Sequence, residues 1–258
     1  MSDVILTHRE GGILTLTFNR VDKKNAITGE MYTLLADQLQ AAATDDSVRV
    51  AVIQGHTEVF TAGNDLMDFM MNPPKLGAGG ELPPVFRFLK YISEFPKPIV
   101  AAVAGPAVGI GTTLLFHCDL IYAGDNAAFS MPFVNLGVCP EAGSSYFMPA
   151  LVGYHRAAEK LMLGEPFYAE EAVEMGLVNR IVPPHEVNAY AQAQAAKLAA
   201  KPMASLVATK MLMKKSQAHV PALMAEEGKI FGEMLVGPAA HEAMSAFMQK
   251  RLPDFSKF

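Results

Sequence analysis

The amino-acid sequence predicts an α/β fold, because short apolar runs of strand character alternate with longer segments of helical periodicity. The chain has 258 residues, of which 51% are hydrophobic, and this is enough for one substantial core. Turn residues bound the strand-like runs, as is typical of buried strands. Strands are expected at Val4–His8, Ile13–Asn19, Val48–Gln54, Ile99–Val103, Leu120–Ala123, Ala128–Ser130 and Asn179–Val182.

Helical segments separate these strands, and from about Glu186 the chain is expected to be wholly helical. The first helix has a defined start, because Thr28 can cap it and Glu30 falls in its first turn. The pattern therefore predicts a core domain over residues 1–185 and a C-terminal helical region over residues 186–258. Helices are expected at Thr28–Ala43, 142–151, Tyr154–Leu163, Ala169–Met175, Glu186–Ala200, Met203–Lys215, Pro221–Val236 and Pro238–Lys250.

Composition and motif spacing exclude several classes of protein. A net charge of −5 without a long basic run argues against nucleic-acid binding, and the apolar runs are too short or too interrupted to span a bilayer. The histidines and cysteines lack the spacing of metal sites, and His117 and Cys118 are interpreted as packed core residues.

The same features predict where the protein resides. The two cysteines suit a reducing cytosol, and the N-terminal residues lack the regions of a signal peptide. The last three residues, Ser256 to Phe258, are close to the peroxisomal Ser-Lys-Leu address but end in phenylalanine. We therefore expect a cytoplasmic protein, with a peroxisomal location as the alternative.

Two glycine-bearing turns in the middle of the chain carry the pattern that is most indicative of chemistry. Gly63 and Gly109 allow backbone angles and close approaches that a side chain would block. The N–H groups of Asn64 and Ile110 would then be available to one oxygen atom. The apolar run 112–116 predicts a buried helix, whose first N–H groups favour negative charge. The turns are expected to hold an oxyanion, unless they are ordinary strand-to-helix turns, which glycine also marks.

A single carboxylate, Glu141, follows these turns in an apolar neighbourhood that includes Phe133, Val138 and Phe147. Burial there would remove hydration from the carboxylate and raise its pKa. Beside an oxyanion site, such a group is equipped to take a proton and so form an enolate. Alternatively, Glu141 caps or starts the helix expected at residues 142–151, because carboxylates are favoured in first turns.

Motifs along nearly the whole chain resemble those of one family, the crotonase (enoyl-CoA hydratase/isomerase) superfamily. The resemblance implies a spiral of repeated ββα turns and an oxyanion hole made by the N–H groups of Asn64 and Ile110. It also implies an acyl-CoA thioester substrate, no cofactor besides the coenzyme A of that substrate, and assembly into a homotrimer or a hexamer of two trimers. The segments that carry the resemblance are Asn19–Arg20, Asn25–Ile27, Phe60–Leu66, Ala102–Gly111, Cys118–Asp119, Gly137–Gly143, Gly164–Ala172, Gly176–Asn179 and Phe247–Pro253.

At the catalytic positions the chain looks like the peroxisomal type of Δ3,Δ2-enoyl-CoA isomerase. Where hydratases carry two glutamates, this chain has Thr113 and Phe133, and the single glutamate of the isomerase type matches Glu141. Moving a double bond from C3 to C2 needs one proton shuttle, whereas hydration is easier with two carboxyl groups. The resemblance thus implies an isomerase. A hydratase or another crotonase enzyme, and a catalytically silent acyl-CoA binding module, are the alternatives.

The resemblance also implies where coenzyme A is held. The backbone of residues 24–26 and 62–66 would line its site, with the adenine near the second segment. The implied substrate-binding residues are Lys24, Ala26, Ala62, Gly63, Asp65, Leu66, Gly109 and Phe133.

One position departs from the family pattern. Many relatives have a lysine for the ribose phosphate where this chain has Met67. Phosphate binding would then fall to Lys23, Lys24, Lys75 or a neighbouring subunit's Lys250, unless the first two form a solvated surface pair.

The segment Asn72–Pro84 is rich in helix and strand breakers and poor in periodicity, which is typical of a loop. Because it follows the first oxyanion segment, it is either a lid over the acyl chain or a plain surface loop.

Overall fold

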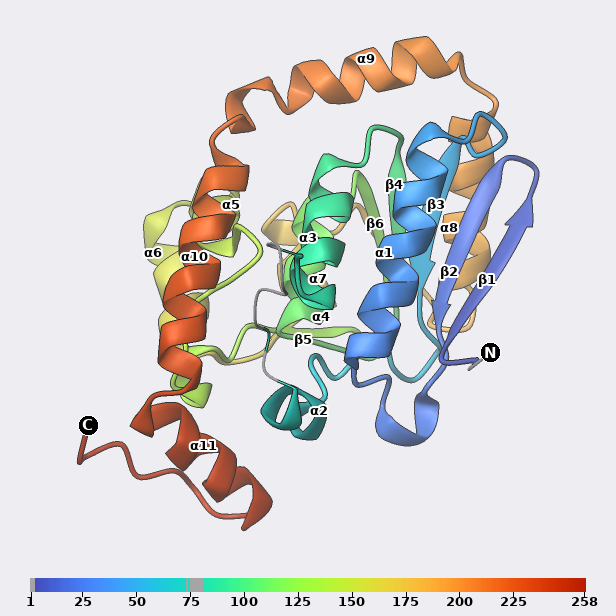
Figure 1. The fold of residues 1–258 in the computed structure, drawn as a ribbon. Helices are drawn as coiled ribbons and strands as arrows, with labels where there is room; N and C mark the ends of the chain where they lie inside the picture. Colours follow the sequence, from blue (N-terminus) through green and yellow to red (C-terminus); the bar gives the residue numbers. More distant parts are fainter. Residues whose placement is uncertain (1–2, 73, 75–80) are drawn as a thin grey trace.

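Strands and helices alternate through most of the chain, as the sequence predicts, and three further helices follow (Figure 1). The computed structural model describes residues 3–72, 74 and 81–258. A six-stranded sheet has the order β1-β2-β3-β4-β6-β9, and a three-stranded sheet has the order β5-β7-β8. The strands are β1 (Ile5–Glu10), β2 (Ile13–Phe18), β3 (Val50–Gln54), β4 (Ile99–Val103), β5 (Pro106–Val108), β6 (Leu120–Gly124), β7 (Ala128–Ser130), β8 (Phe167–Tyr168) and β9 (Arg180–Val182).

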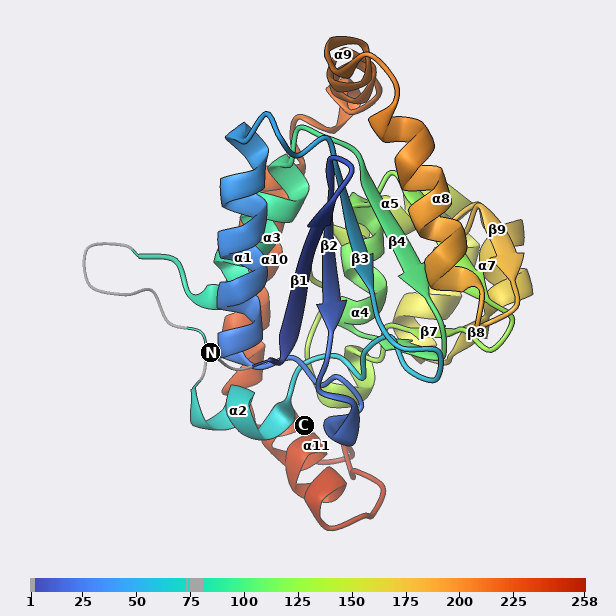
Figure 2. The ribbon, with the colours of Figure 1, turned by 90° about the vertical axis from the view of Figure 1, so that its right-hand side faces the viewer.

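The large sheet is covered on both faces, which explains why its central strands read as continuous apolar runs. Beyond the antiparallel β1–β2 hairpin its neighbouring strands are parallel. Helices α1 (Gly29–Thr44) and α3 (Pro84–Glu94) lie on one side of the sheet, and α8 (Val187–Ala199) lies on the other (Figure 2). Side chains alternate accordingly. Val100 belongs to the buried cluster under α8, whereas Ala101 belongs to the larger core on the opposite face.

Most predicted helices are present, with boundaries shifted by a few residues. Thr28 caps α1 by accepting a hydrogen bond from the Met31 N–H at 3.4 Å. The segment 154–163 divides into an α-helix and a π-helical turn, and the helix expected at 142–151 begins only at Ser144. The remaining helices are α2 (Leu66–Met71), α4 (Ile110–Thr113), α5 (Ser144–Val152), α6 (Tyr154–Ala158), α7 (Ala169–Glu174), α9 (Met203–Met213), α10 (Val220–Leu235) and α11 (Pro238–Met248).

Sequence reasoning missed four elements: α2, α3, β5 and β8. The two strands are only three and two residues long, too short to show a period. Helix α3 begins at Pro84, the second residue of a proline pair that ends the loop expected at 72–84. Of that loop, residues 73 and 75–80 lie outside the described residues, so the choice between a lid and a plain surface loop stays a prediction.

The last three helices leave the sheet. In Figure 1 they form an arc, with α9 across the top of the view, α10 descending beside the core and α11 at the bottom. A buried lysine anchors the start of this arc, because the Lys210 ammonium donates to the Asp119 carboxylate at 2.7 Å and to the Lys97 carbonyl at 2.8 Å. Of the helices that the structure describes, none is long and apolar enough to cross a membrane.

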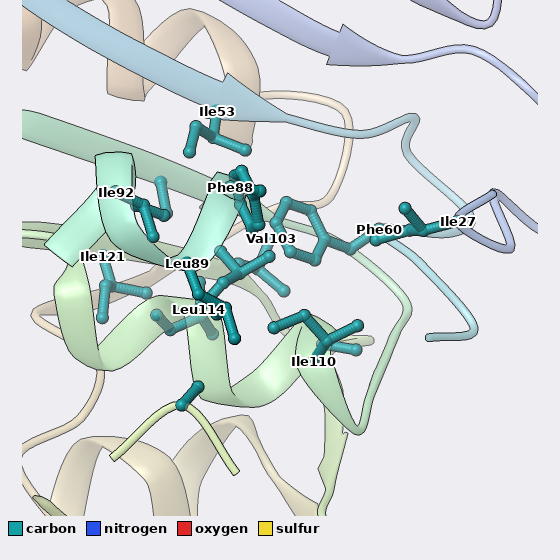
Figure 3. Close-up of a cluster of buried hydrophobic side chains, with 14 of the residues drawn as sticks. Ile27, Ile53, Phe60, Phe88, Leu89, Ile92, Val103, Ile110, Leu114 and Ile121 are labelled. Carbon is teal, nitrogen blue, oxygen red and sulfur yellow. The ribbon is translucent and has the colours of Figure 1, made fainter. Parts of the chain in front are cut away.

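The main core fixes the segments that precede and follow the two glycine turns (Figure 3). Phe60 is fully buried and leads directly into the first turn, while the Ile110 side chain is 2% exposed and follows the second. Both belong to the cluster that includes Phe88 of α3 and Leu114. Because core side chains rarely shift, the backbone between these anchors is held in place.

Candidate active site

The two glycine turns run side by side in parallel. Thr61 pairs with Ala107, and the Val108 N–H donates to the Thr61 carbonyl at 3.0 Å. Asn64 and Ile110 each lie three residues beyond the paired positions. Two adjacent segments therefore carry Asn64 and Ile110 at the same distance in sequence from their paired residues.

This close approach requires glycine. A Cβ atom on Gly63 would lie 2.6 Å from the Val108 carbonyl oxygen, and the φ angle there is +85°. A Cβ atom on Gly111 would lie 2.5 Å from the Thr61 methyl group. Gly109 differs from both, because a Cβ atom there would meet no other atom within 4 Å. Glycine is favoured at this position by its φ angle of +56° instead. That open side is where a ligand can approach the backbone.

Both candidate N–H donors are available. Within the part of the chain that the structure describes, neither the Asn64 nor the Ile110 N–H group donates a hydrogen bond. The buried helix predicted for the run 112–116 is present as the short helix α4 followed by a 3-10 turn, and nearly all of its residues are buried. The Asn64 amide side chain accepts a short hydrogen bond from the buried Tyr32 hydroxyl. Burial raises the pKa of Tyr32 well above its usual value, so the phenol stays neutral and donates.

Glu141 lies in the turn before α5 rather than in the helix itself. Its carboxylate accepts a short hydrogen bond from the Thr113 hydroxyl of α4. The next residue, Ala142, has a φ of +57°, which is unfavourable for a residue with a Cβ atom. A backbone held in such a region marks a position that the surroundings over-determine, as functional residues often do. The alternative that Glu141 caps or starts this helix is wrong, because the N-cap residue of α5 is Gly143 and its first residue is Ser144.

Burial dominates the electrostatics of Glu141. It raises the pKa of the carboxyl from 4.5 to about 8, against the hydrogen bond from Thr113, which lowers the pKa. The negative charge of Glu227 raises it further. A carboxyl group with a pKa near neutrality can both accept and return a proton at physiological pH.

Glu141 and Asn64 line the same small cavity, of about 30 Å³. Its walls are otherwise apolar and include Phe69 of α2, Phe86 of α3 and Phe231 of α10. A larger hollow of about 510 Å³ between α3 and α10 shares Phe86 and other lining residues with it. Apolar space of this size next to a buried carboxyl group suits a substrate with a hydrocarbon part.

The segments expected to hold coenzyme A also come together. The Ala62 N–H donates to the Lys24 carbonyl at 2.9 Å, so the segments 24–26 and 62–66 lie side by side. Asp65 caps α2 and pairs with Arg20 at 2.7 Å, and Leu66 is the first residue of that helix. Ala26 follows Lys24 and Asn25, whose φ angles are +51° and +53°.

Other predicted binding residues are placed less directly. Phe133 is buried at 5% exposure and is not among the described residues that line the small cavity. Lys75 lies outside the described residues, and Lys250 follows the end of α11. His117 is a buried core residue, as expected, but it also donates to the Ala142 carbonyl at 2.9 Å.

Sequence reasoning missed two groups near the site, Tyr32 and Glu227. In the sequence, Tyr32 looks like one more apolar position of α1, and nothing there predicts its hydrogen bond to Asn64. Glu227 carried a signal: it is spaced three residues from Met224 and four from Phe231, so a carboxylate falls on the apolar face of α10. In the described residues no three His, Cys, Asp or Glu side chains are grouped so as to hold a metal ion.

Comparison with known proteins identifies the family. Residues 8–257 match the family described as enoyl-CoA hydratase/isomerase, and the chain belongs to that family. A crystal structure of an enoyl-CoA hydratase/isomerase from Pseudoalteromonas atlantica T6c matches with a TM-score of 0.93 at 38% identity, over 98% of this chain and 100% of that one. The fold is therefore the crotonase fold with C-terminal helices, as the resemblance implied.

The relatives include both hydratases and isomerases. The 2,3-dehydroadipyl-CoA hydratase of Escherichia coli K12 is 35% identical over 256 residues, which cover 99% of both chains. The enoyl-CoA delta isomerase 2 of Rattus norvegicus is 43% identical over 181 residues, which cover 69% of this chain and 46% of the rat protein. The protein is thus a crotonase-family acyl-CoA enzyme, and its particular reaction has to be argued from the site.

Proposed function

We propose that the protein is a Δ3,Δ2-enoyl-CoA isomerase with Glu141 as its proton shuttle. One observation carries this proposal. Among the described residues, Glu141 is the only carboxylate that lines the cavity shared with Asn64, and the residue that contacts it from α4 is Thr113 rather than a second acid. A single acid-base group suits a reaction that moves a proton and adds no water.

The proposed reaction has two proton transfers. Ionised Glu141 removes a proton from C2 of the 3-enoyl thioester, and the electron pair moves onto the thioester oxygen. The N–H groups of Asn64 and Ile110 stabilise the resulting dienolate oxyanion. Glu141 then returns the proton to C4, and the double bond comes to lie between C2 and C3. Because Thr113 donates to Oε1, the proton travels on Oε2.

The coenzyme A part would be held by the backbone of residues 24–26 and 62–66, which the fold brings together. The acyl chain would extend past Phe86 toward the hollow between α3 and α10. Large apolar side chains that are exposed on the C-terminal helices support assembly into a homotrimer or a hexamer. Two free cysteines are compatible with a reducing, cytoplasmic compartment.

A second candidate is an enoyl-CoA hydratase. The observation in its favour is the full-length similarity to the Escherichia coli hydratase. Hydration would need a second carboxyl group to act on water. Glu227 is near enough to affect Glu141, but hydrogen bonds from the start of α5 occupy both of its oxygens.

The Glu141→Gln variant tests the proposal. With a 3-enoyl-CoA substrate, isomerisation creates a conjugated thioester and absorbance rises. We expect kcat to fall by about 100- to 10,000-fold with little change in KM, because the shuttle is lost and binding is not. The matched control is Glu165→Gln, because Glu165 is exposed and is not among the residues that line the cavity.

Three outcomes would overturn the assignment. A variant that keeps most of its activity excludes Glu141 as the shuttle. A wild-type protein that consumes a 2-enoyl-CoA with loss of conjugation, and leaves the 3-enoyl isomer unchanged, is a hydratase. A protein that binds both thioesters without changing either spectrum is a binding module.

A further inference from the structure

The start of helix α5 is capped by a residue from another helix. Its N-cap residue is Gly143, which has no side chain to accept hydrogen bonds from the first N–H groups. Glu227 of α10 supplies the missing acceptor. Its Oε2 accepts from the Gly143 N–H at 2.6 Å, and its Oε1 accepts from the Ser145 N–H at 3.1 Å and from the Ser145 hydroxyl.

These hydrogen bonds stabilise the turn that carries Glu141. Gly143 is two residues beyond Glu141, and between them lies Ala142 with its unfavourable φ of +57°. On the other side of the turn the His117 imidazole donates to the Ala142 carbonyl at 2.9 Å. The turn is therefore held in this conformation by groups from two different elements, in addition to the Thr113 hydroxyl on the carboxylate itself.

Glu227 and Glu141 are two carboxylates that share one buried region. Glu227 is 5% exposed and accepts from three donors, whereas the side chain of Glu141 accepts from one. A helix N-terminus also favours negative charge. Burial raises the pKa of Glu227, and the hydrogen bonds from Ser145 and Gly143 oppose this rise because they favour the ionised form. In that form its charge opposes ionisation of Glu141.

The helix that carries Glu227 also forms a wall of the catalytic cavity. Met224, Gly228 and Phe231 of α10 line that cavity together with Glu141. A Cβ atom on Gly228 would lie 3.1 Å from the Phe86 ring, so α10 is closely seated against α3. The packing of α10 against α3 therefore positions both the apolar wall of the cavity and Glu227.

We propose that Glu227 is a positioning residue for the proton shuttle: it holds the turn of Glu141 in place and sets the protonation of that carboxyl through its charge. The proposal rests on the proposed function, in which Glu141 moves the proton. Glu227 itself does not line the cavity among the described residues, so it acts through Glu141 and not on the substrate.

Two variants of Glu227 separate its hydrogen bonds from its charge. In Glu227→Ala the Gly143 and Ser145 N–H groups lose their acceptor, and we expect kcat to fall by about 10- to 100-fold with KM changed less than about threefold. Glu227→Gln keeps one of the two acceptor oxygens and removes the charge, so kcat should fall less than in Glu227→Ala. The control is Glu226→Gln, because Glu226 neighbours Glu227 on α10 but is exposed.

The pH profile is the readout that a merely structural role would not move. The other titratable groups that interact with Glu141 are Tyr32 of α1 and Cys139 of the same loop, and His117 lies against its turn. Burial raises the pKa of the first two and lowers that of His117 to about 3, so all three stay neutral near pH 7–8. In Glu227→Gln the acid limb of kcat/KM should therefore move to lower pH by about one unit.

Two measurements on the ligand-free protein keep this test independent of the reaction. Carboxyl NMR should show the Glu141 midpoint falling in Glu227→Gln, and amide hydrogen exchange at Gly143 and Ser145 should accelerate in Glu227→Ala. An unchanged midpoint together with unchanged exchange would overturn the proposal, whatever the wild-type activity. A wild type that lacks isomerase activity, with both NMR effects present, overturns the proposed function and leaves the coupling of Glu227 to Glu141 supported. If Glu227→Ala fails to fold, the midpoint in Glu227→Gln alone decides.

Discussion

The sheet-containing region and the C-terminal helices α9–α11 contribute to the candidate site in different ways. The sheet-containing region supplies main-chain groups, the Asn64 and Ile110 N–H donors, and the turn of Glu141. Its central strands β3 and β4 are almost fully buried. The C-terminal helices supply side chains instead, among them Phe231 and Glu227 of α10.

This difference indicates a division of labour. Backbone donors depend on the shape of two turns, which the core holds, and they suit any thioester. The surroundings of the Glu141 carboxylate depend instead on side chains of α10, where the chain returns to the site after α9. Changes in the sheet-containing region should therefore act on geometry, and changes in α10 should act on pKa and on the shape of the acyl site.

The pH dependence of stability should distinguish the two carboxylates most strongly. Between 4.5 and about 8 the folded protein keeps a proton on Glu141 that the unfolded chain has released. The unfolded state then binds fewer protons, so the free energy of unfolding decreases as pH rises through this range, by roughly 5 kcal/mol in total. Glutamine does not titrate, so the free energy of unfolding of Glu141→Gln should lack this decrease. The variant should therefore become more stable relative to the wild type as pH rises from 5 to 9.

Urea unfolding at pH 5, 7 and 9 measures this gain. In Glu227→Gln the gain should be smaller, because hydrogen bonds from Ser145 and Gly143 counteract the effect of burial on the pKa of Glu227. Equal gains in both variants, or a stability difference that is constant with pH, would contradict the distinction between the two carboxylates.

The same substitution in the two regions should have unequal effects on catalysis. In Gly63→Ala the new methyl group meets a backbone oxygen at 2.6 Å and the φ of +85° becomes strained, so the turn must shift. We expect kcat to fall by about 100- to 1,000-fold, the usual cost of an oxyanion donor. In Gly228→Ala the methyl group meets the edge of the Phe86 ring at 3.1 Å, which can give way. Activity there should stay within about threefold, and helix propensity should raise stability by up to about 1 kcal/mol.

Initial rates with a 3-enoyl-CoA and thermal unfolding of both variants test this contrast. A large loss of kcat in Gly228→Ala would show that the acyl wall is as intolerant as the oxyanion turns, and the division between the two regions would fail.

The fold was largely predictable because its signals are local. Buried parallel strands read as apolar runs, and Ile99–Val103 was predicted with its observed boundaries. Thr28 marked the start of α1 by its capping chemistry. The pairing of the Asn64 and Ile110 turns was expected from a family resemblance, since local pattern alone shows two glycine turns and not their adjacency.

The part that could not be predicted is the return of α10 to the site. Periodicity shows that this helix has an apolar face but not which surface the face covers. Glu227 meets Gly143 across 84 positions of sequence, and only the folded chain reveals the contact. The pKa of Glu141 likewise depends on burial by α3 and α10 together, although its direction was expected from local composition.

The smallest expected effect concerns Met67, the position where the family resemblance implies a lysine in many relatives. Met67 is 53% exposed at the start of α2, beside the segment proposed to hold coenzyme A. In Met67→Lys an ammonium near the phosphates should lower KM for acyl-CoA by about two- to fivefold at low salt, the range of an exposed ion pair. Most of the gain should disappear at 0.5 M salt, because screening acts on exposed charges. Met71→Lys, one turn further along the same helix, is the control. A fall in KM in Met71→Lys but not in Met67→Lys would show that the phosphates of coenzyme A do not lie near position 67. The sheet-containing region would then bind coenzyme A through other side chains in addition to its backbone.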